Sequence, residues 1–199
     1  MRVLLVGATG TVGKTIAAAL GHRHELISAG RSAGDLRVDL TDEESVRAMY
    51  AKAGRLDAVV AATGHTHFGP LTEMTPGQFK SGLLDKVMGQ VSLVLLGIPH
   101  VSDGGSFTLT SGILNRDQIR QGANAAAVDN AIDGFVAAAA IEMPRGLRIN
   151  AVSPGLLADS AEAYYGFFPG HAPVSSARVG LAYVKSVEGA LTGKVFCVD

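Results

Sequence analysis

Residues 1–13 read MRVLLVGATGTVG, and this stretch determines the predicted fold. An apolar run ends in three glycines spaced three apart, Gly7, Gly10 and Gly13, and an alanine-rich amphipathic segment follows. The order strand, tight turn, helix is typical of the first βα unit of a dinucleotide-binding domain, where such glycines permit the turn, the approach of a pyrophosphate and close helix packing. The helix N-terminus attracts phosphate charge. We therefore expect a dinucleotide ligand at this turn.

The second βα unit indicates which dinucleotide is bound. Residues 25–29 form a predicted strand that leads into Gly30, Arg31 and Ser32. NAD-specific proteins carry an acidic residue near this place, about 20 residues after the glycines. The guanidinium of Arg31 can instead bind a 2′-phosphate in bidentate fashion. The sequence thus favours NADP(H) over NAD(H).

Residues 8–15, ATGTVGKT, also approach the P-loop pattern if alanine replaces its first glycine. In that alternative Lys14 would hold phosphates and Thr15 a magnesium ion. A P-loop protein also needs an apolar strand that ends in aspartate for the metal. The best later strand, residues 56–62, is followed by Thr63 instead, so the P-loop is the less favoured interpretation.

Composition narrows the protein class. The chain has 199 residues, 47% of them hydrophobic, and a net charge of −1, which gives no basic field for nucleic acid. Its one cysteine, Cys197, has no internal disulfide partner, which is typical of a reducing compartment. We identify no apolar run of the roughly 18 residues that span a bilayer. These features predict a cytoplasmic protein without membrane or nucleic-acid partners.

Apolar runs with strand character alternate with helical patterns along the chain. This alternation predicts an α/β fold: one domain over residues 1–199, doubly wound in the Rossmann manner, with a mostly parallel seven-stranded sheet and helices on both faces. The predicted strands lie near residues 2–6, 25–29, 36–39, 56–62, 105–110, 147–152 and 194–198.

The segment 156–174 is the one long irregular stretch, and it carries Tyr164, Tyr165, Phe167 and Phe168. Loops of this length usually have a function. We interpret it as a lid over a substrate. The two tyrosines can supply a phenol from this lid, although aromatic packing over the pocket mouth is the favoured role.

Four blocks resemble motifs of the short-chain dehydrogenase/reductase family: GATGTVG at 7–13, VDLTD at 38–42, AATG at 61–64 and RINAVSPG at 148–155. The resemblance extends over nearly the whole chain. It implies that Asp39 holds the adenine amino group and that the last block lies beside the nicotinamide. The cofactor-contacting residues predicted in this way are Gly7, Thr9, Gly10, Thr11, Val12, Gly13, Arg31, Ser32, Asp39, Leu40, Ala61, Ala62, Thr63, Gly64, Pro154 and Gly155.

The catalytic residues depart from that family. The resemblance implies a tetrad of Asn, Ser, Tyr and Lys, with Tyr as acid or base, Lys lowering its pKa and Ser polarising the carbonyl. Alignment places Ala125 at the tyrosine position and Asp129 at the lysine position. The loss does not depend on the alignment, because residues 51–163 contain no tyrosine and residues 87–184 no lysine.

The other two positions provide candidate catalytic residues. The family's serine would fall on Gly112, and Ser111 is the nearest substitute. Lys86 takes the place of the asparagine and can return positive charge near the cofactor. A solvated helix lysine is the alternative interpretation of Lys86.

His65 and His67 follow the turn at residues 61–64, at the carboxyl end of a strand where ligands of open α/β sheets bind. Either imidazole can transfer a proton near neutral pH. Loop histidines bonded to the backbone are the favoured interpretation. A metal site is not expected, because no third ligand accompanies the pair.

Two functions remain. The first is an NADP(H)-dependent oxidoreductase for a small carbonyl or alcohol, with an atypical active site. The second is a redox-silent NADP(H)-binding sensor or scaffold on the same fold. The resemblance favours the first, and the missing tyrosine and lysine favour the second. The resemblance also implies a homodimer or homotetramer formed through helices near residues 77–98 and 120–142.

Overall fold

Seven parallel strands form one sheet in the order β3-β2-β1-β4-β5-β6-β7. The computed structural model describes residues 1–164 and 166–199. The predicted doubly wound α/β fold is confirmed, although the third strand is shorter than predicted and the fifth begins earlier. The strands are β1 (Arg2–Val6), β2 (Glu25–Gly30), β3 (Leu36–Arg37), β4 (Leu56–Ala61), β5 (Val101–Thr110), β6 (Arg148–Pro154) and β7 (Val195–Val198).

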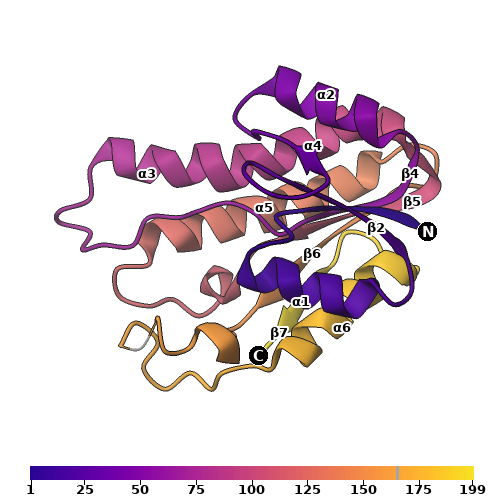
Figure 1. Ribbon diagram of the computed structural model, residues 1–199. Coiled ribbons are helices and arrows are strands. Elements are labelled where there is room, and N and C mark those ends of the chain that lie inside the picture. The colour runs from indigo at the N-terminus through magenta and orange to yellow at the C-terminus, as the bar shows by residue number, and fades with distance from the viewer. Residues whose placement is uncertain (165) are drawn as a thin grey trace.

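Helices cover both faces of this sheet (Figure 1). Helices α1 and α6 pack on one face, and α2, α4 and α5 pack on the other. A π-helical turn, Leu83–Met88, joins α3 to α4. The helices are α1 (Thr11–Leu20), α2 (Glu43–Ala53), α3 (Pro76–Gly82), α4 (Gly89–Gly97), α5 (Ala123–Glu142) and α6 (Ser176–Glu188).

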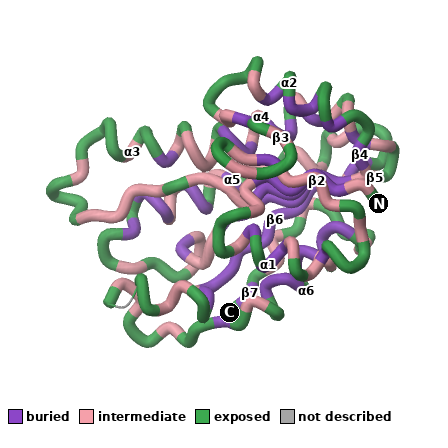
Figure 2. The backbone as a smooth tube through the Cα atoms, viewed as in Figure 1, coloured by how far each residue is buried: buried purple, intermediate pink, exposed green. Residues whose placement is uncertain are grey.

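Residues 3–6 of strand β1 are all apolar because both faces of the strand are buried. Leu4 and Val6 belong to the core on the α2, α4 and α5 side, whereas Val3 and Leu5 belong to the core under α1 and α6. All four are at most 1% exposed. A parallel strand with helices on both faces needs apolar side chains at every position. The central strands accordingly appear as largely buried segments of the backbone trace (Figure 2).

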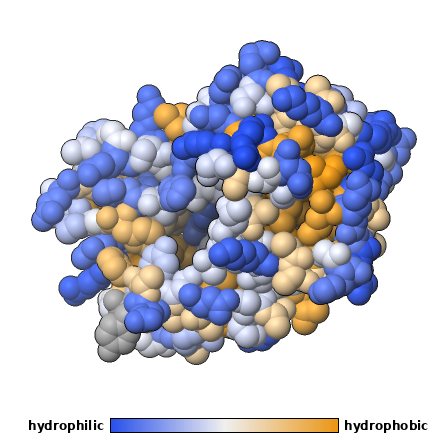
Figure 3. All heavy atoms as spheres, in the orientation of Figure 1, coloured by the Kyte–Doolittle hydropathy of each residue, from blue (hydrophilic) through white to orange (hydrophobic). Residues whose placement is uncertain are grey.

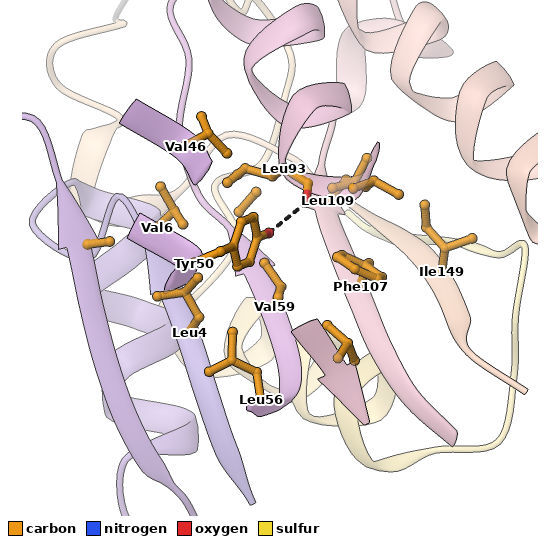
Figure 4. Close-up of a cluster of buried hydrophobic side chains, with 14 of the residues drawn as sticks. Leu4, Val6, Val46, Tyr50, Leu56, Val59, Leu93, Phe107, Leu109 and Ile149 are labelled. Carbon is orange, nitrogen blue, oxygen red and sulfur yellow. Dashed lines mark hydrogen bonds between the residues drawn. The ribbon is translucent and has the colours of Figure 1, made fainter. Parts of the chain in front are cut away.

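Tyr50 anchors helix α2 to the larger core. Its ring is fully buried among Leu4, Val59 and Phe107, and its hydroxyl donates to the carbonyl oxygen of Leu93 in α4 at 2.6 Å (Figure 4). This hydrogen bond satisfies a polar group that would otherwise be costly to bury. Burial raises the pKa of the Tyr50 phenol, so it stays protonated.

The helical stretch Pro76–His100 corrects one expectation from the sequence. By length and composition alone it can cross a membrane, with a mean hydropathy of 1.4 in its most apolar window. In the fold its α4 part places Leu93 and Val94 against the sheet, where both are at most 1% exposed. Leu93 and Val94 therefore serve the core on that face, whereas Leu95 on the same helix is 58% exposed.

Candidate active site

The carboxyl ends of the strands open into a cavity of about 790 Å³. It lies where the strand order reverses between β1 and β4, which is the usual ligand position in open α/β sheets. The face seen in Figure 3 is visibly hollowed. The predicted residues that line the cavity are Gly7, Thr9, Gly10, Thr11, Val12, Arg31, Ser32, Leu40, Ala62, Thr63, Gly64, Lys86, Ser111, Pro154 and Gly155.

Three predicted cofactor residues, Gly13, Asp39 and Ala61, do not line the cavity. Ala61 is fully buried in β4 and serves the core. Gly13 lies beneath the turn rather than on its surface. A sequence motif does not separate residues that line the cavity from their buried neighbours, because both belong to the same short block of sequence.

The glycine turn is a tight backbone structure. Gly7 has a φ of +87°, and a Cβ there would lie 2.3 Å from the carbonyl oxygen of Ala62. A Cβ on Gly13 would lie 2.0 Å from the carbonyl oxygen of Gly7, so only glycine permits helix α1 to approach the turn. Gly10 is the N-cap of α1 and supplies no side-chain cap. The N–H groups of the first helical turn can therefore bind an anion.

The P-loop alternative is wrong. Thr15 is buried at 7% exposure, and its hydroxyl donates to the carbonyl oxygen of Thr11 at 3.1 Å. It is therefore directed into helix α1 and not towards a metal ion. Lys14 is exposed and does not line the cavity.

At the adenosine end, Arg31 is the charged group on the cavity wall, with 69% of its side chain exposed. Its Nη2 atom lies 3.4 Å from Oδ1 of Asp39. Asp39 also accepts hydrogen bonds from the N–H and hydroxyl of Thr41 at 3.0 and 2.7 Å, and these bonds lower the pKa of the Asp39 carboxyl. The Asp39 carboxylate is thus already bonded to Thr41 and Arg31. Its contact with adenine stays a prediction.

At the opposite end, Lys86 projects from the π-helical turn into the site. Its Nζ donates to Oδ1 of Asp129 in α5 at 2.7 Å and to the carbonyl oxygen of Ser111 at 3.1 Å. The side chains of Lys86 and Asp129 are only 13% and 4% exposed. Lys86 is therefore not the solvated lysine of the alternative interpretation. Burial raises the pKa of the Asp129 carboxyl, and the nearby ammonium of Lys86 partly opposes this shift.

Ser111 lies immediately beyond β5. Its N–H donates to the carbonyl oxygen of Val152, whereas its hydroxyl is buried and has no hydrogen-bond partner within the described residues. Because a buried hydroxyl normally finds a partner, this orphan group on the cavity wall is suited to a ligand oxygen.

Gly112, at the family's serine position, lies against the Asp129 carboxylate. A Cβ on Gly112 would lie 2.7 Å from Oδ2 of Asp129. A serine at 112 would therefore require the Asp129 carboxylate to shift from its present position. The glycine at 112 leaves the room that the Asp129 carboxylate requires.

Two buried amides that the sequence analysis missed fix the surrounding loops. Gln90 accepts from the N–H of Thr110 at 2.8 Å and donates to the carbonyl oxygens of Thr110 and Thr63, so it joins the ends of β5 and β4. Asn124 accepts from the N–H of His67 at 2.8 Å and donates to the carbonyl oxygen of Phe79. Gln90 and Asn124 each lie in a largely apolar helical stretch of the sequence, and such an amide could have indicated a buried polar contact.

The two loop histidines lie at the margin of the site. His65 is 97% exposed on the cavity rim, and its Nδ1 lies 3.2 Å from Oδ2 of Asp85. His67 faces a smaller neighbouring hollow of about 340 Å³. Tyr164 lines the main cavity, whereas its predicted companion Tyr165 falls outside the described residues.

Taken together, the parallel sheet, the glycine turn at a helix N-terminus and the cavity at the switch point define a dinucleotide-binding α/β protein. Residues 9–182 match the family model described as enoyl-(acyl carrier protein) reductase. This match covers most of the chain. The protein belongs to the short-chain dehydrogenase/reductase family, as the motifs predict.

Solved structures are similar over the whole chain. The protein lin1944 from Listeria innocua is 48% identical, with a TM-score of 0.98 and full coverage of both chains. A small-chain dehydrogenase in complex with NADPH is 27% identical, with a TM-score of 0.88 over 100% of this chain and 96% of the other.

Curated relatives are longer. L-fucose dehydrogenase from Oryctolagus cuniculus is 35% identical over 133 residues, which are 63% of this chain and 46% of that protein. Versicolorin reductase stcU from Emericella nidulans is 27% identical over 77% of this chain and 68% of its own length. The chain thus spans about half the length of the first relative and two thirds of the second. Both names are those of oxidoreductases.

Proposed function

We propose that the protein is an NADP(H)-dependent oxidoreductase that interconverts a small carbonyl compound and its alcohol. The observation that carries this proposal is the unpartnered, buried hydroxyl of Ser111 on the wall of the cavity, next to the Lys86–Asp129 pair. The NADPH complex of a structural neighbour supports the choice of cofactor.

The cavity walls fit this cofactor. The uncapped N-terminus of α1 at Gly10 suits the pyrophosphate, and Arg31 with Ser32 suits the 2′-phosphate. By resemblance, Pro154 and Gly155 lie beside the nicotinamide. When bound, the cofactor supplies or accepts the hydride.

Ser111 and Lys86 perform the remaining chemistry in this proposal. The Ser111 hydroxyl donates a hydrogen bond to the substrate carbonyl and stabilises the negative charge that develops on its oxygen. Lys86 has three N–H donors, of which Asp129 and the Ser111 carbonyl occupy two, so one remains for the substrate oxygen. Lys86 donates the proton, and Asp129 acts as a positioning residue that holds the ammonium in place.

Replacing Arg31 by alanine is expected to weaken NADPH binding by about 1.5–3 kcal/mol, roughly ten- to a hundredfold, and to leave NADH binding nearly unchanged. The reason is that the guanidinium makes charge-assisted hydrogen bonds only with the 2′-phosphate. Isothermal calorimetry with both cofactors measures the effect. Equal affinity of the unmodified protein for NADPH and NADH would contradict the role of Arg31.

Replacing Ser111 by alanine is expected to lower turnover by about 10²- to 10³-fold with little change in NADPH affinity, because the lost donor acts on the transition state. Ser106→Ala is the matched control. Ser106 lies in β5, the strand that ends just before Ser111; it is buried and also has an unpartnered hydroxyl, but it does not line the cavity. Similar turnover in the two variants would exclude Ser111 from the chemistry.

The redox-silent NADP(H)-binding protein is the second candidate function. The observation in its favour is that Ala125, at the family's tyrosine position, lines the cavity without any proton-donating group. In this alternative the Lys86–Asp129 pair has a structural role only. The two functions differ in whether bound NADPH is ever oxidised.

We also propose a cytoplasmic homodimer or homotetramer. Apolar side chains on the two helices that the resemblance assigns to subunit contacts support it: Leu84, Met88, Leu95 and Ile141 are 45–87% exposed. Burial of this surface in a second copy removes apolar area from water. Sedimentation analysis is expected to give at least twice the 20.5 kDa subunit mass, and Leu95→Glu to reduce it. A monomer in both cases would contradict the proposal.

A further inference from the structure

An aromatic cluster lies at the substrate end of the cavity. Phe68, from the loop after β4, has its ring centroid 6.2 Å from that of Tyr164 and 6.0 Å from that of Phe167. Tyr164 lies 6.2 Å from Phe168. The cluster therefore joins two segments that are about a hundred residues apart in sequence, and three of its rings, Phe68, Tyr164 and Phe168, line the cavity.

Two of these three ring pairs are edge to face, and the third, Phe68–Tyr164, is tilted. The interplanar angles are 56° for Phe68–Tyr164, 70° for Phe68–Phe167 and 87° for Tyr164–Phe168. In edge-to-face pairs an edge of one ring meets a face of the other, so ring faces remain outside the pair. Tyr164 is 39% exposed and Phe68 is half-buried, so apolar ring surface is left for a ligand.

Contacts with neighbouring loops hold the aromatic cluster in position. His171 meets the Phe168 ring edge-on, with centroids 5.2 Å apart. The Nε2 atom of His171 lies 3.0 Å from Oδ2 of Asp117, which connects the segment 156–174 to the loop before α5. Asn124 holds the other loop through the N–H of His67. A wall held on both sides is preorganised to bind a rigid partner.

Among the described residues, the buried charges at this end form one ion pair, and the Asp85 carboxylate lies at the rim with 32% of its side chain exposed. Lys86 and Asp129 neutralise each other at 2.7 Å, and the carboxylate of Asp85 accepts from the N–H of His65. Apolar residues here are Ile113, Leu114, Leu156 and Leu157, and the polar side chains beside them, such as Thr66 and Ser160, are uncharged. Such walls disfavour a charged substrate, because its charge would be desolvated without a partner.

We propose that the substrate is an uncharged carbonyl compound, or its alcohol, whose body is an aromatic ring that packs against Phe68, Tyr164 and Phe168. This inference rests on the proposed function and specifies its substrate class. Ring-on-ring contacts add affinity beyond that of an aliphatic group of equal size, and several such contacts favour the aromatic compound roughly five- to tenfold.

Phenylacetone and cyclohexylacetone test this proposal, because they differ in the ring and share the same carbonyl environment. We expect kcat/KM with NADPH to be roughly five- to tenfold higher for phenylacetone. Phe68→Leu and Phe168→Leu, which remove a ring but keep apolar volume, are expected to abolish most of the difference. Phe135→Leu is the matched control, since Phe135, within α5, packs against the core and does not line the cavity.

Calorimetry with the alcohols 1-phenyl-2-propanol and 1-cyclohexyl-2-propanol on NADPH-loaded protein provides a readout that requires no turnover. Tighter binding of the phenyl alcohol, together with no NADPH oxidation by either ketone, would refute the proposed reaction and retain the aromatic site. Turnover without a phenyl preference, or a preference that Phe68→Leu and Phe168→Leu leave intact, would overturn the aromatic site and retain the reaction.

Discussion

Lys86→Met is expected to lower the free energy of unfolding by about 3–5 kcal/mol at neutral pH and to abolish carbonyl reduction. The variant leaves the Asp129 carboxylate buried without its cation, only 4% exposed. Because burial already raises the pKa of Asp129, loss of the ammonium raises it further. A carboxyl with a raised pKa in the folded state favours folding when protonated, and this contribution is lost as the pH rises through its folded-state pKa.

The sign of this effect gives a pH dependence. The stability deficit of Lys86→Met is expected to be smallest below the ordinary pKa of aspartate, near 4, and to grow towards neutral pH. Urea unfolding of the variant and of the unmodified protein across this range measures it. A deficit that does not change with pH would show that Asp129 is not left as an unpaired charge.

The double variant Lys86→Met with Asp129→Asn separates stability from catalysis. The amide removes the unpaired charge at nearly constant shape, so most of the lost stability is expected to return. Turnover is expected to stay at least 10²-fold below that of the unmodified protein, because the proton donor is absent. Recovery of turnover together with stability would assign the ion pair a structural role only.

Gly13→Ala is expected to have the second large effect, a loss of NADPH binding together with about 1–3 kcal/mol of stability. The new Cβ would lie 2.0 Å from the Gly7 carbonyl oxygen, so the turn under the pyrophosphate must move. Gly134→Ala is the matched control: it lies within α5 with no atom close to its Cβ position, and is expected to gain about 0.5–1 kcal/mol. Unchanged NADPH affinity in Gly13→Ala would refute the assigned turn geometry.

The fold was predictable because its signals are local. The apolar run of residues 2–6 and the glycines at 7, 10 and 13 encode strand, turn and helix within a few residues of one another. The predicted strand boundaries were less accurate. The third strand was predicted over residues 36–39, but β3 ends at Arg37. The π-helical turn at Leu83–Met88 leaves no distinct pattern in the sequence, since it extends an ordinary helical stretch.

The candidate site was only partly predictable. Motif blocks gave most of the cavity lining, because backbone loops at strand ends follow from the fold. Lys86 and Asp129 pair although they are 43 residues apart. The sequence analysis treated Lys86 as a candidate catalytic residue and Asp129 only as the replacement of the family's lysine. Their proximity, and the fit of Gly112 to the same carboxylate, emerge only when α5 packs beside the π-helical turn.

The oxidation of NADPH by the purified protein, followed through the absorbance of the reduced nicotinamide, tests the central claim most directly. With a panel of neutral aromatic and aliphatic carbonyl compounds, the account predicts saturable oxidation that Ser106→Ala retains and Ser111→Ala lowers by about 10²-fold or more. Tight NADPH binding with no oxidation of NADPH by any compound would contradict it and establish the redox-silent binding protein.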